Sequence, residues 1–135
     1  MTLVIDASIA GQWYFGLAGS ARAERLLESE DRLIAPDLLI AEFTNAAWKA
    51  VIFGGLSAAA AIAAIVDIDS ELDELVPALE LKDRALTIAL ELRHPAYDCF
   101  YLALAEQRGC QLVTADERLV RRCKGTPFAE LARAL

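Results

Sequence analysis

The chain is poor in cysteine and in histidine. Its 135 residues include three cysteines and one histidine. Three is an odd number, and no two of the cysteines form a C-x-x-C pair, so a disulfide framework is not expected. Cys99, Cys110 and Cys123 are therefore predicted to be reduced and mostly buried. His94 is followed by Pro95, which indicates a loop, and no histidine is expected to act as a catalytic base.

Basic residues are in the minority. Lys and Arg number 13 against 20 Asp and Glu, which gives a formal charge of −7. This balance argues against broad binding of nucleic acid through a generally basic surface, so any such contact must be local. One dense basic cluster follows Asp116 and could grip phosphate, although a solvated helix face is an equal alternative. The cluster consists of Arg118, Arg121, Arg122 and Lys124. The aromatic run 13–15 is expected to pack in the core or an interface rather than against a base.

The sequence also predicts neither a leader nor an uninterrupted membrane span. Met1-Thr2 leads directly into an apolar run, without a basic region and cleavage site, so a cytoplasmic protein is expected. The stretch from Ala50 to Val66 is uncharged and nearly long enough to span a bilayer, but Gly54-Gly55 and Ser57 interrupt it. Because Gly often ends helices and Ser often begins them, two helices that meet at a turn are predicted.

Length and composition indicate one domain with a covered surface. A single domain over residues 1–135 is expected, since no repeat, low-complexity tract or linker divides the chain. A hydrophobic content of 56% suggests that a partner chain covers part of the surface, and a homodimer is predicted. Small-residue faces between Ala46 and Val66 could seat a partner helix, although a hairpin of two helices explains the same alanines equally well.

Short apolar runs alternate with longer helical stretches. Strands are expected at Leu3–Ile5, Leu33–Ala35, Glu74–Val76 and Gln111–Val113. Helices are expected at 7–15, from 20 through 27, at 38–53, 57–69, 79–92, 97–108 and 116–123, while 128–131 could be a last strand or a helical end. Asp37 is expected to cap one helix and Gly109 to end another. This alternation predicts an α/β fold with a parallel sheet between helices, because each parallel crossover needs room for a helix.

Four carboxylates lie where strands end or on helices beside them. Asp6 follows the first apolar run and Asp116 follows Leu112-Val113, and open α/β sheets bind ligands just beyond the carboxyl ends of their strands. Glu42 and Asp98 lie near the beginnings of two predicted helices. Close carboxylates repel one another unless a cation neutralises them, and oxygen ligands favour Mg²⁺ or Mn²⁺. A divalent-metal site is therefore the leading hypothesis.

Each of these acids also has an ordinary structural explanation, as a helix cap or a solvated helix residue. The shared site is favoured because each acid except Asp98 has a small polar residue two or three positions away. These neighbours are Ser8 after Asp6, Thr114 before Asp116, and Asn45 on the same helix face as Glu42.

The segments that carry these residues resemble the PIN domain, and most closely the VapC-like toxins. The matching segments are Val4–Ser8, Pro36-Asp37 with Glu42 and Asn45, Tyr97-Asp98 leading into Tyr101–Ala105, Leu112–Leu119, and the tail Gly125–Phe128. The resemblance covers essentially the whole chain, but Ser57–Leu92 carries no family signature. It implies a three-layer α/β/α sandwich with a central parallel sheet. It also implies that Asp6, Glu42, Asp98 and Asp116 are metal-binding catalytic acids, with Ser8, Asn45 and Thr114 in support.

The resemblance further implies an endoribonuclease that depends on Mg²⁺ or Mn²⁺ and has RNA as its substrate. It implies that the protein is the toxin of a toxin–antitoxin pair, with a cognate antitoxin as partner and often a dimeric state. Metal ions would stabilise the developing negative charge and activate water, with Asp98 or Asp116 as possible proton acceptors. The alternative is a PIN fold that binds RNA or an antitoxin but cleaves slowly. An aspartyl-phosphate protein is disfavoured, because Ser8 stands where related phosphatases carry a second Asp.

Overall fold

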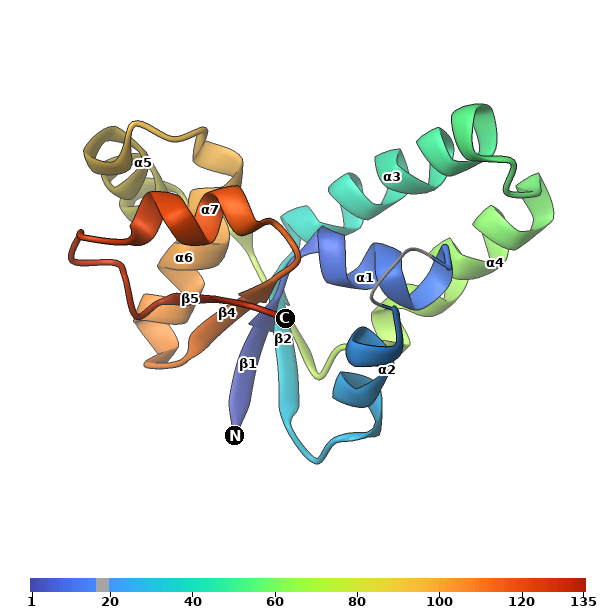
Figure 1. Cartoon of the computed structure of the whole chain (residues 1–135), viewed down its shortest axis with the longest axis horizontal. Helices are drawn as coiled ribbons and strands as arrows, with labels where there is room; N and C mark the ends of the chain where they lie inside the picture. The colour runs from blue at the N-terminus through green and yellow to red at the C-terminus, as the bar shows by residue number, and fades with distance from the viewer. Residues whose placement is uncertain (17–19) are drawn as a thin grey trace.

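A computed structural model of the chain describes residues 1–16 and 20–135 (Figure 1). The strands are β1 (Thr2–Ile5), β2 (Arg32–Pro36), β3 (Glu74–Val76), β4 (Gln111–Thr114) and β5 (Ala132–Ala134). The helices are α1 (Ala7–Tyr14), α2 (Ser20–Glu28), α3 (Leu38–Gly54), α4 (Ala58–Asp67), α5 (Lys82–Leu92), α6 (Ala96–Arg108) and α7 (Glu117–Cys123), with short 3₁₀ helices η1 (Ile68–Glu71) and η2 (Ala78–Glu80). The predicted alternation of strands and helices is confirmed.

The five strands form one parallel sheet in the order β3-β2-β1-β4-β5. The central strand β1 pairs with β4 so that Ile5 lies opposite Val113. The residues that follow, Asp6 and Thr114, are consequently neighbours at the carboxyl end of the sheet. This edge is the place where open α/β sheets bind ligands.

Helices cover both faces of the sheet, as Figure 1 shows. Alternate strand residues point to opposite faces, so the three central strands β2, β1 and β4 each contribute to two apolar clusters. Leu3, Ile5, Leu33 and Val113 pack with Ile9 of α1 and with Ala23 and Leu26 of α2. Val4, Ile34 and Leu112 belong to the larger cluster with residues of α3, α5 and α6. The expected three-layer α/β/α sandwich is confirmed.

The apolar stretch 50–66 folds as the predicted pair of helices. Helix α3 ends at Gly54, and Gly55 has the left-handed φ of 76° that glycine adopts without steric penalty. Ser57 then caps α4 by accepting a hydrogen bond from the amide of Ala60 at 3.1 Å. Within residues 1–16 and 20–135, none of the helices combines the length and apolarity that a membrane crossing requires.

Two further predictions about packing are confirmed. The aromatic run of α1 packs inside the fold: the rings of Tyr14 and Phe15 lie 5.5 and 5.3 Å from that of Phe43, and the indole of Trp13 donates to the carbonyl of Ala23 at 2.8 Å. The three cysteines are free, two of them buried and one half-buried, and burial raises the pKa of each thiol.

Two local predictions are wrong. Asp37 precedes α3 but has helical dihedral angles, and its carboxylate does not cap that helix. It instead accepts from the amide of Ala78 at 2.9 Å, which ties the end of β2 to the segment after β3. Residues 128–131 are neither strand nor helix, because buried Phe128 anchors a turn in which the Leu131 amide donates to the Phe128 carbonyl. The last strand begins only at Ala132.

Candidate functional site

Asp6 is the centre of a hydrogen-bonded group at the carboxyl end of β1. It is 7% exposed and is one of only two buried polar or charged residues in the described parts of the chain, the other being Thr114. Its Oδ1 accepts from the hydroxyl of Ser8 at 2.5 Å and from the amides of Ser8 and Ile9 at 3.1 and 3.3 Å, which makes it the N-cap of α1. Its Oδ2 accepts from the hydroxyl of Thr114.

The two hydroxyls join Asp6 to the turn that follows β4. Ser8 Oγ accepts from the amide of Ala115, and Thr114 Oγ1 accepts from the amide of Asp116, both at 3.0 Å. Each hydroxyl thus donates to the carboxylate and accepts from the turn, so both tie Asp6 to the turn. Ser8 and Thr114, proposed from sequence as supporting groups, are brought together with Asp6.

The carboxylates influence one another through their charge. Burial raises the pKa of Asp6 to about 6, against the lowering effect of its hydrogen bonds from Ser8, Thr114 and Ile9, and the charge of Asp98 raises it further. Burial also raises the pKa of Glu42, where the hydrogen bond from Tyr101 acts in the opposite direction and Asp98 again adds to the rise. Asp98 therefore lies close enough to both acids to repel them.

Glu42 lies in the second turn of α3 and is held by a tyrosine. Its Oε1 accepts from the hydroxyl of Tyr101 on α6 at 2.6 Å. Tyr101 is 1% exposed, and burial together with the charge of Glu42 raises its pKa, so the phenol stays a neutral donor. The sequence interpretation treated Tyr101 only as part of a family motif. Its spacing of three residues from Asp98 on one helix face is the signal that could have identified it.

Asp98 is held by His94, the only histidine of the chain. His94 does lie in the loop before α6, as expected, but its Nε2 is 2.6 Å from Asp98 Oδ2. An ionised carboxylate only accepts, so the imidazole is the donor. The spacing of four residues between His94 and Asp98 could have indicated this contact. Pro95, which lies between them, suggested a loop instead.

Asp116 caps α7 and borders a hollow with a basic wall. Its Oδ1 accepts from the amides of Arg118 and Leu119 at 3.0 and 3.4 Å. The hollow has a volume of about 540 Å³. Its lining consists of Arg93, His94, Pro95, Asp98, Asp116, Arg118, Arg121 and Arg122. Two of the four acids therefore share one hollow with most of the predicted basic cluster.

The members of that cluster differ in what they contact. Arg118 lies 3.7 Å from Asp116, and Arg121 lies 3.8 Å from Glu117, both as exposed ion pairs. Arg122 donates to the carbonyls of Leu92 and Arg93 at 2.8 and 3.0 Å. Its guanidinium therefore anchors the end of α5.

Two of the predicted residues are not brought into this arrangement. Lys124 does not line the hollow. Asn45 is exposed, and its side chain makes no hydrogen bond with the described residues.

The acids do not form a preformed metal cage. Over residues 1–16 and 20–135, no three His, Cys, Asp or Glu side chains stand close enough together to hold an ion. The donor chemistry nevertheless fits Mg²⁺ or Mn²⁺, which prefer carboxylate oxygens. Glu42 Oε2 and Asp98 Oδ1 accept no hydrogen bond from the described residues, so each acid has an oxygen to offer.

Comparison with known proteins identifies the family. A model of the PIN domain matches residues 3–125. "Ribonuclease VapC3" of Pyrobaculum aerophilum is 34% identical over 90% of this chain and 95% of its own. "Exonuclease VapC9" of the same organism is 32% identical over 78% of both chains. The structure of VapBC2 from Rickettsia felis, bound to a DNA fragment from their promoter, has the same fold, with a TM-score of 0.67, 12% identity and coverage of 100% of this chain and 99% of that one. This chain therefore belongs to the PIN-domain family, in its VapC branch.

Proposed function

We propose that this protein is a cytoplasmic endoribonuclease that depends on Mg²⁺ or Mn²⁺ and acts as the toxin of a toxin–antitoxin pair. One observation carries the proposal. Asp6 is buried at the carboxyl end of the central strand and oriented by Ser8 and Thr114, and the charge of Asp98 acts on both Asp6 and Glu42. A buried carboxylate with a second negative charge nearby is unfavourable for folding, which supports a role in holding a cation.

Asp6, Glu42, Asp98 and Asp116 would hold the metal. When bound, a divalent ion supplies Lewis acidity and neutralises the charge that develops on the phosphate. Mg²⁺ keeps several waters and often binds through one or two carboxylates together with substrate phosphates, so it does not require a closed cage of protein ligands. The hydroxyls of Ser8, Thr114 and Tyr101 and the imidazole of His94 orient the acids that receive the ion.

The hollow beside the acids supplies the contact with RNA. Arg118 and Arg121 are exposed on its wall next to Asp98 and Asp116, so a phosphate drawn to these arginines would lie beside the carboxylates. This arrangement allows a protein with a net charge of −7 to bind RNA locally. Asp98 and Asp116, which both line the hollow, are the candidates to accept the proton from the attacking water.

The decisive experiment is cleavage of labelled RNA in Mg²⁺, Mn²⁺ or EDTA, with linear and circular forms of the same sequence. Cleavage of the circle requires an internal cut, so this comparison separates an endonuclease from an exonuclease. We expect metal-dependent cleavage of both forms, which Asp6→Asn abolishes. Asp69→Asn removes the same charge from an exposed site and should leave cleavage unchanged. Cleavage that persists in EDTA, or in Asp6→Asn, would contradict the proposal.

The second candidate is a module that binds RNA through the basic wall of the hollow but cleaves it slowly. It predicts that the wild-type protein binds RNA but produces no fragments in either metal, and that Asp6→Asn binds equally well. Binding should be measured by fluorescence anisotropy on the same RNA.

The helix hairpin is the proposed seat of the antitoxin. Figure 1 shows α3 and α4 extending away from the sheet. An apolar groove of about 250 Å³ lies between them, and Trp48 and Ile62 in its lining are 54% and 65% exposed. An amphipathic helix of the partner would cover these side chains. Ile62→Asp should weaken capture of the co-expressed antitoxin, whereas Leu79→Asp, at an exposed leucine outside the groove, should not.

We also infer a homodimer from the high apolar content. Light scattering of the purified chain should give twice the mass of 14.7 kDa. A clean monomer at micromolar concentration would exclude the dimer.

A further inference from the structure

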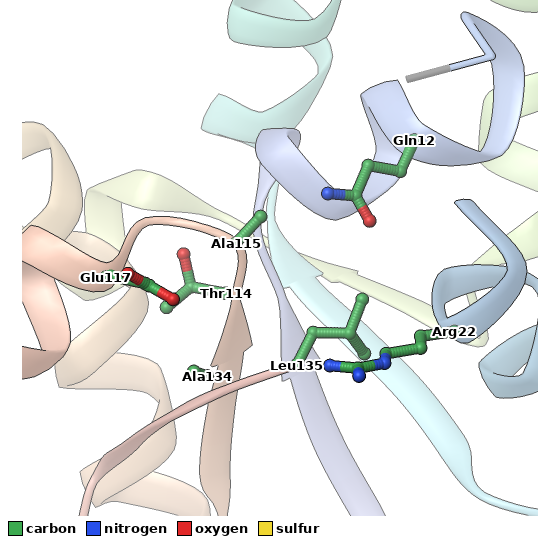
Figure 2. Close-up of a pocket in the computed structure, with 7 residues that line it drawn as sticks. All are labelled: Gln12, Arg22, Thr114, Ala115, Glu117, Ala134 and Leu135. Carbon is green, nitrogen blue, oxygen red and sulfur yellow. The ribbon is translucent and has the colours of Figure 1, made fainter. Parts of the chain in front are cut away.

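A second pocket lies across the β4–α7 turn from the basic hollow. Figure 2 shows it between that turn, α1, α2 and the end of β5. Its volume is about 160 Å³. Residues 114, 115 and 117 of the turn line this pocket, while 116 and 118 line the hollow, so the turn separates the two. Thr114 lines the pocket and donates a hydrogen bond to Asp6, so a single side chain lies between the pocket and the proposed cleavage site.

Gln12 places an unsatisfied polar atom at this pocket. Its Oε1 is buried, and it is the one buried side-chain nitrogen or oxygen without a hydrogen-bond partner in the described residues. Buried acceptors are nearly always paired, because an unpaired one is unfavourable. In Figure 2 the amide of Gln12 points from α1 toward Ala115 and the pocket. The oxygen is covered in this conformation, and a turn of the amide about its last side-chain bond, which is a soft torsion, would bring it to a donor that comes with a ligand in the pocket.

We infer that the pocket binds one base of the RNA substrate, a base that carries an amino group beside an unprotonated ring nitrogen, as adenine and cytosine do. The inference rests on the proposed ribonuclease function. The carbonyl oxygen of Gln12 accepts from the amino group, and its amide nitrogen donates to the ring nitrogen, which is the paired contact that Gln makes with adenine. Uracil has a ring N–H and no amino group, and so does not match this pattern.

The size and lining of the pocket suit a planar ring. An engineered cavity of about 150 Å³ takes up benzene, so the pocket has the scale of one aromatic ring. Figure 2 shows the guanidinium of Arg22 beside the side chain of Leu135. Arg22 makes no hydrogen bond or ion pair with residues 1–16 and 20–135, which leaves its planar group available to stack on a base. Leu135 and Ala115 supply apolar contact.

A phosphate is a poorer occupant than a base. The carboxylate of Glu117 also lines the pocket and repels anions. The unpaired atom of Gln12 is an acceptor, and a phosphate oxygen has no proton to donate to it. Charge and hydrogen-bonding pattern therefore both favour an uncharged base with a donor on its edge.

The test is the base preference of cleavage. Short RNAs that differ at one nucleotide next to the cut are compared by kcat/KM in wild type, Gln12→Leu and the control Gln107→Leu, which changes an exposed glutamine on α6. We expect wild type and the control to favour adenine or cytosine over uracil at one position by roughly 5- to 150-fold. Gln12→Leu should lose this preference while its rate on the uracil substrate is unchanged.

Arg22 is tested in the same assay. Arg22→Ala should lower kcat/KM about equally for all bases, because stacking does not depend on base identity. Arg25→Ala, on the same helix but outside the pocket, should not change kcat/KM. Should Gln12→Leu fail to fold, as judged by circular dichroism, Gln12→Met takes its place.

Two outcomes are distinguishable. If wild type cleaves RNA and Gln12→Leu keeps the same base preference, the pocket does not read a base, although the proposed function stands. If wild type cleaves no RNA, the proposed function fails. Binding of the same RNAs then shows whether the pocket recognises a base. Equal discrimination by wild type and Gln12→Leu in that binding assay would then overturn the inference.

Discussion

The carboxylate of Asp6 is predicted to destabilise the metal-free protein at neutral pH, so that Asp6→Asn should be more stable than wild type. Asp6 is 7% exposed, and its pKa rises from the ordinary 3.8 to about 6, chiefly through burial. A raised pKa means that the folded state binds the proton more tightly than the unfolded state. The stability that comes from this proton is fully present below pH 4 and is lost as the pH rises through 6.

The magnitude follows from the same pKa. At about 1.4 kcal/mol per pH unit, the rise corresponds to about 3 kcal/mol at pH 8 and to about half of this at pH 5. Asn at position 6 retains an oxygen that can accept from the Ser8 and Ile9 amides. Its amide nitrogen would face Thr114 Oγ1, which can accept if its own proton turns toward Ser8 Oγ, 3.5 Å away. The substitution therefore removes the charge and preserves the helix cap.

The measurement is urea unfolding in EDTA at pH 5 and pH 8. Asp6→Asn should exceed the free energy of unfolding of wild type by about 2–3 kcal/mol at pH 8, and this advantage should shrink at pH 5. Asp69→Asn removes an exposed carboxylate and controls for the change in net charge. A variant that is less stable than wild type at pH 8, or whose advantage does not depend on pH, would refute the argument.

Further predictions concern residues around the site and the cap of α4. Arg122→Ala should lower the free energy of unfolding, measured in urea, by about 1–3 kcal/mol, because two carbonyls at the end of α5 lose their charged donor. Arg121→Ala should leave the free energy of unfolding unchanged but weaken RNA binding, measured by anisotropy, and flatten its salt dependence. A loss of stability in Arg121→Ala and a loss of RNA binding in Arg122→Ala would contradict this. Tyr101→Phe should destabilise by about 1.5–3 kcal/mol, since Glu42 loses a hydrogen bond, and an unchanged urea midpoint would show that water replaces the phenol. Ser57→Ala should destabilise by about 1 kcal/mol through loss of the cap of α4, which thermal melting would detect.

The sheet and the helix hairpin were predictable because local chemistry determines them. The run Leu3–Ile5 is buried on both faces, as a central parallel strand requires, and its apolar character alone identifies it. Gly54-Gly55 and Ser57 mark the break in the apolar stretch because they end one helix and begin the next. Parallel pairing then brings Asp6 next to Thr114 without further information.

The interactions that were missed connect segments distant in sequence or compete with a local role. Asp37 has the residue type of a helix cap, yet the Ala78 amide, 41 positions away, takes its carboxylate. Arg122 was grouped with a phosphate-binding cluster by charge, but the carbonyls at the end of α5 bind it. No local sequence pattern predicts such partners, because they depend on how the helices pack.

The structural and functional interpretations of the acids are compatible, because helix capping uses only one oxygen of each carboxylate. Asp6 and Asp116 both accept from backbone amides through Oδ1. Oδ2 of Asp6 accepts only from Thr114, and Oδ2 of Asp116 accepts from none of the described residues. The cap therefore fixes the position of each carboxylate at the sheet edge, and the second oxygen keeps at least one lone pair for another partner. Sequence could not choose between a cap and a ligand, since one side chain can serve as both, and a rigid cap holds a ligand where a mobile side chain would not.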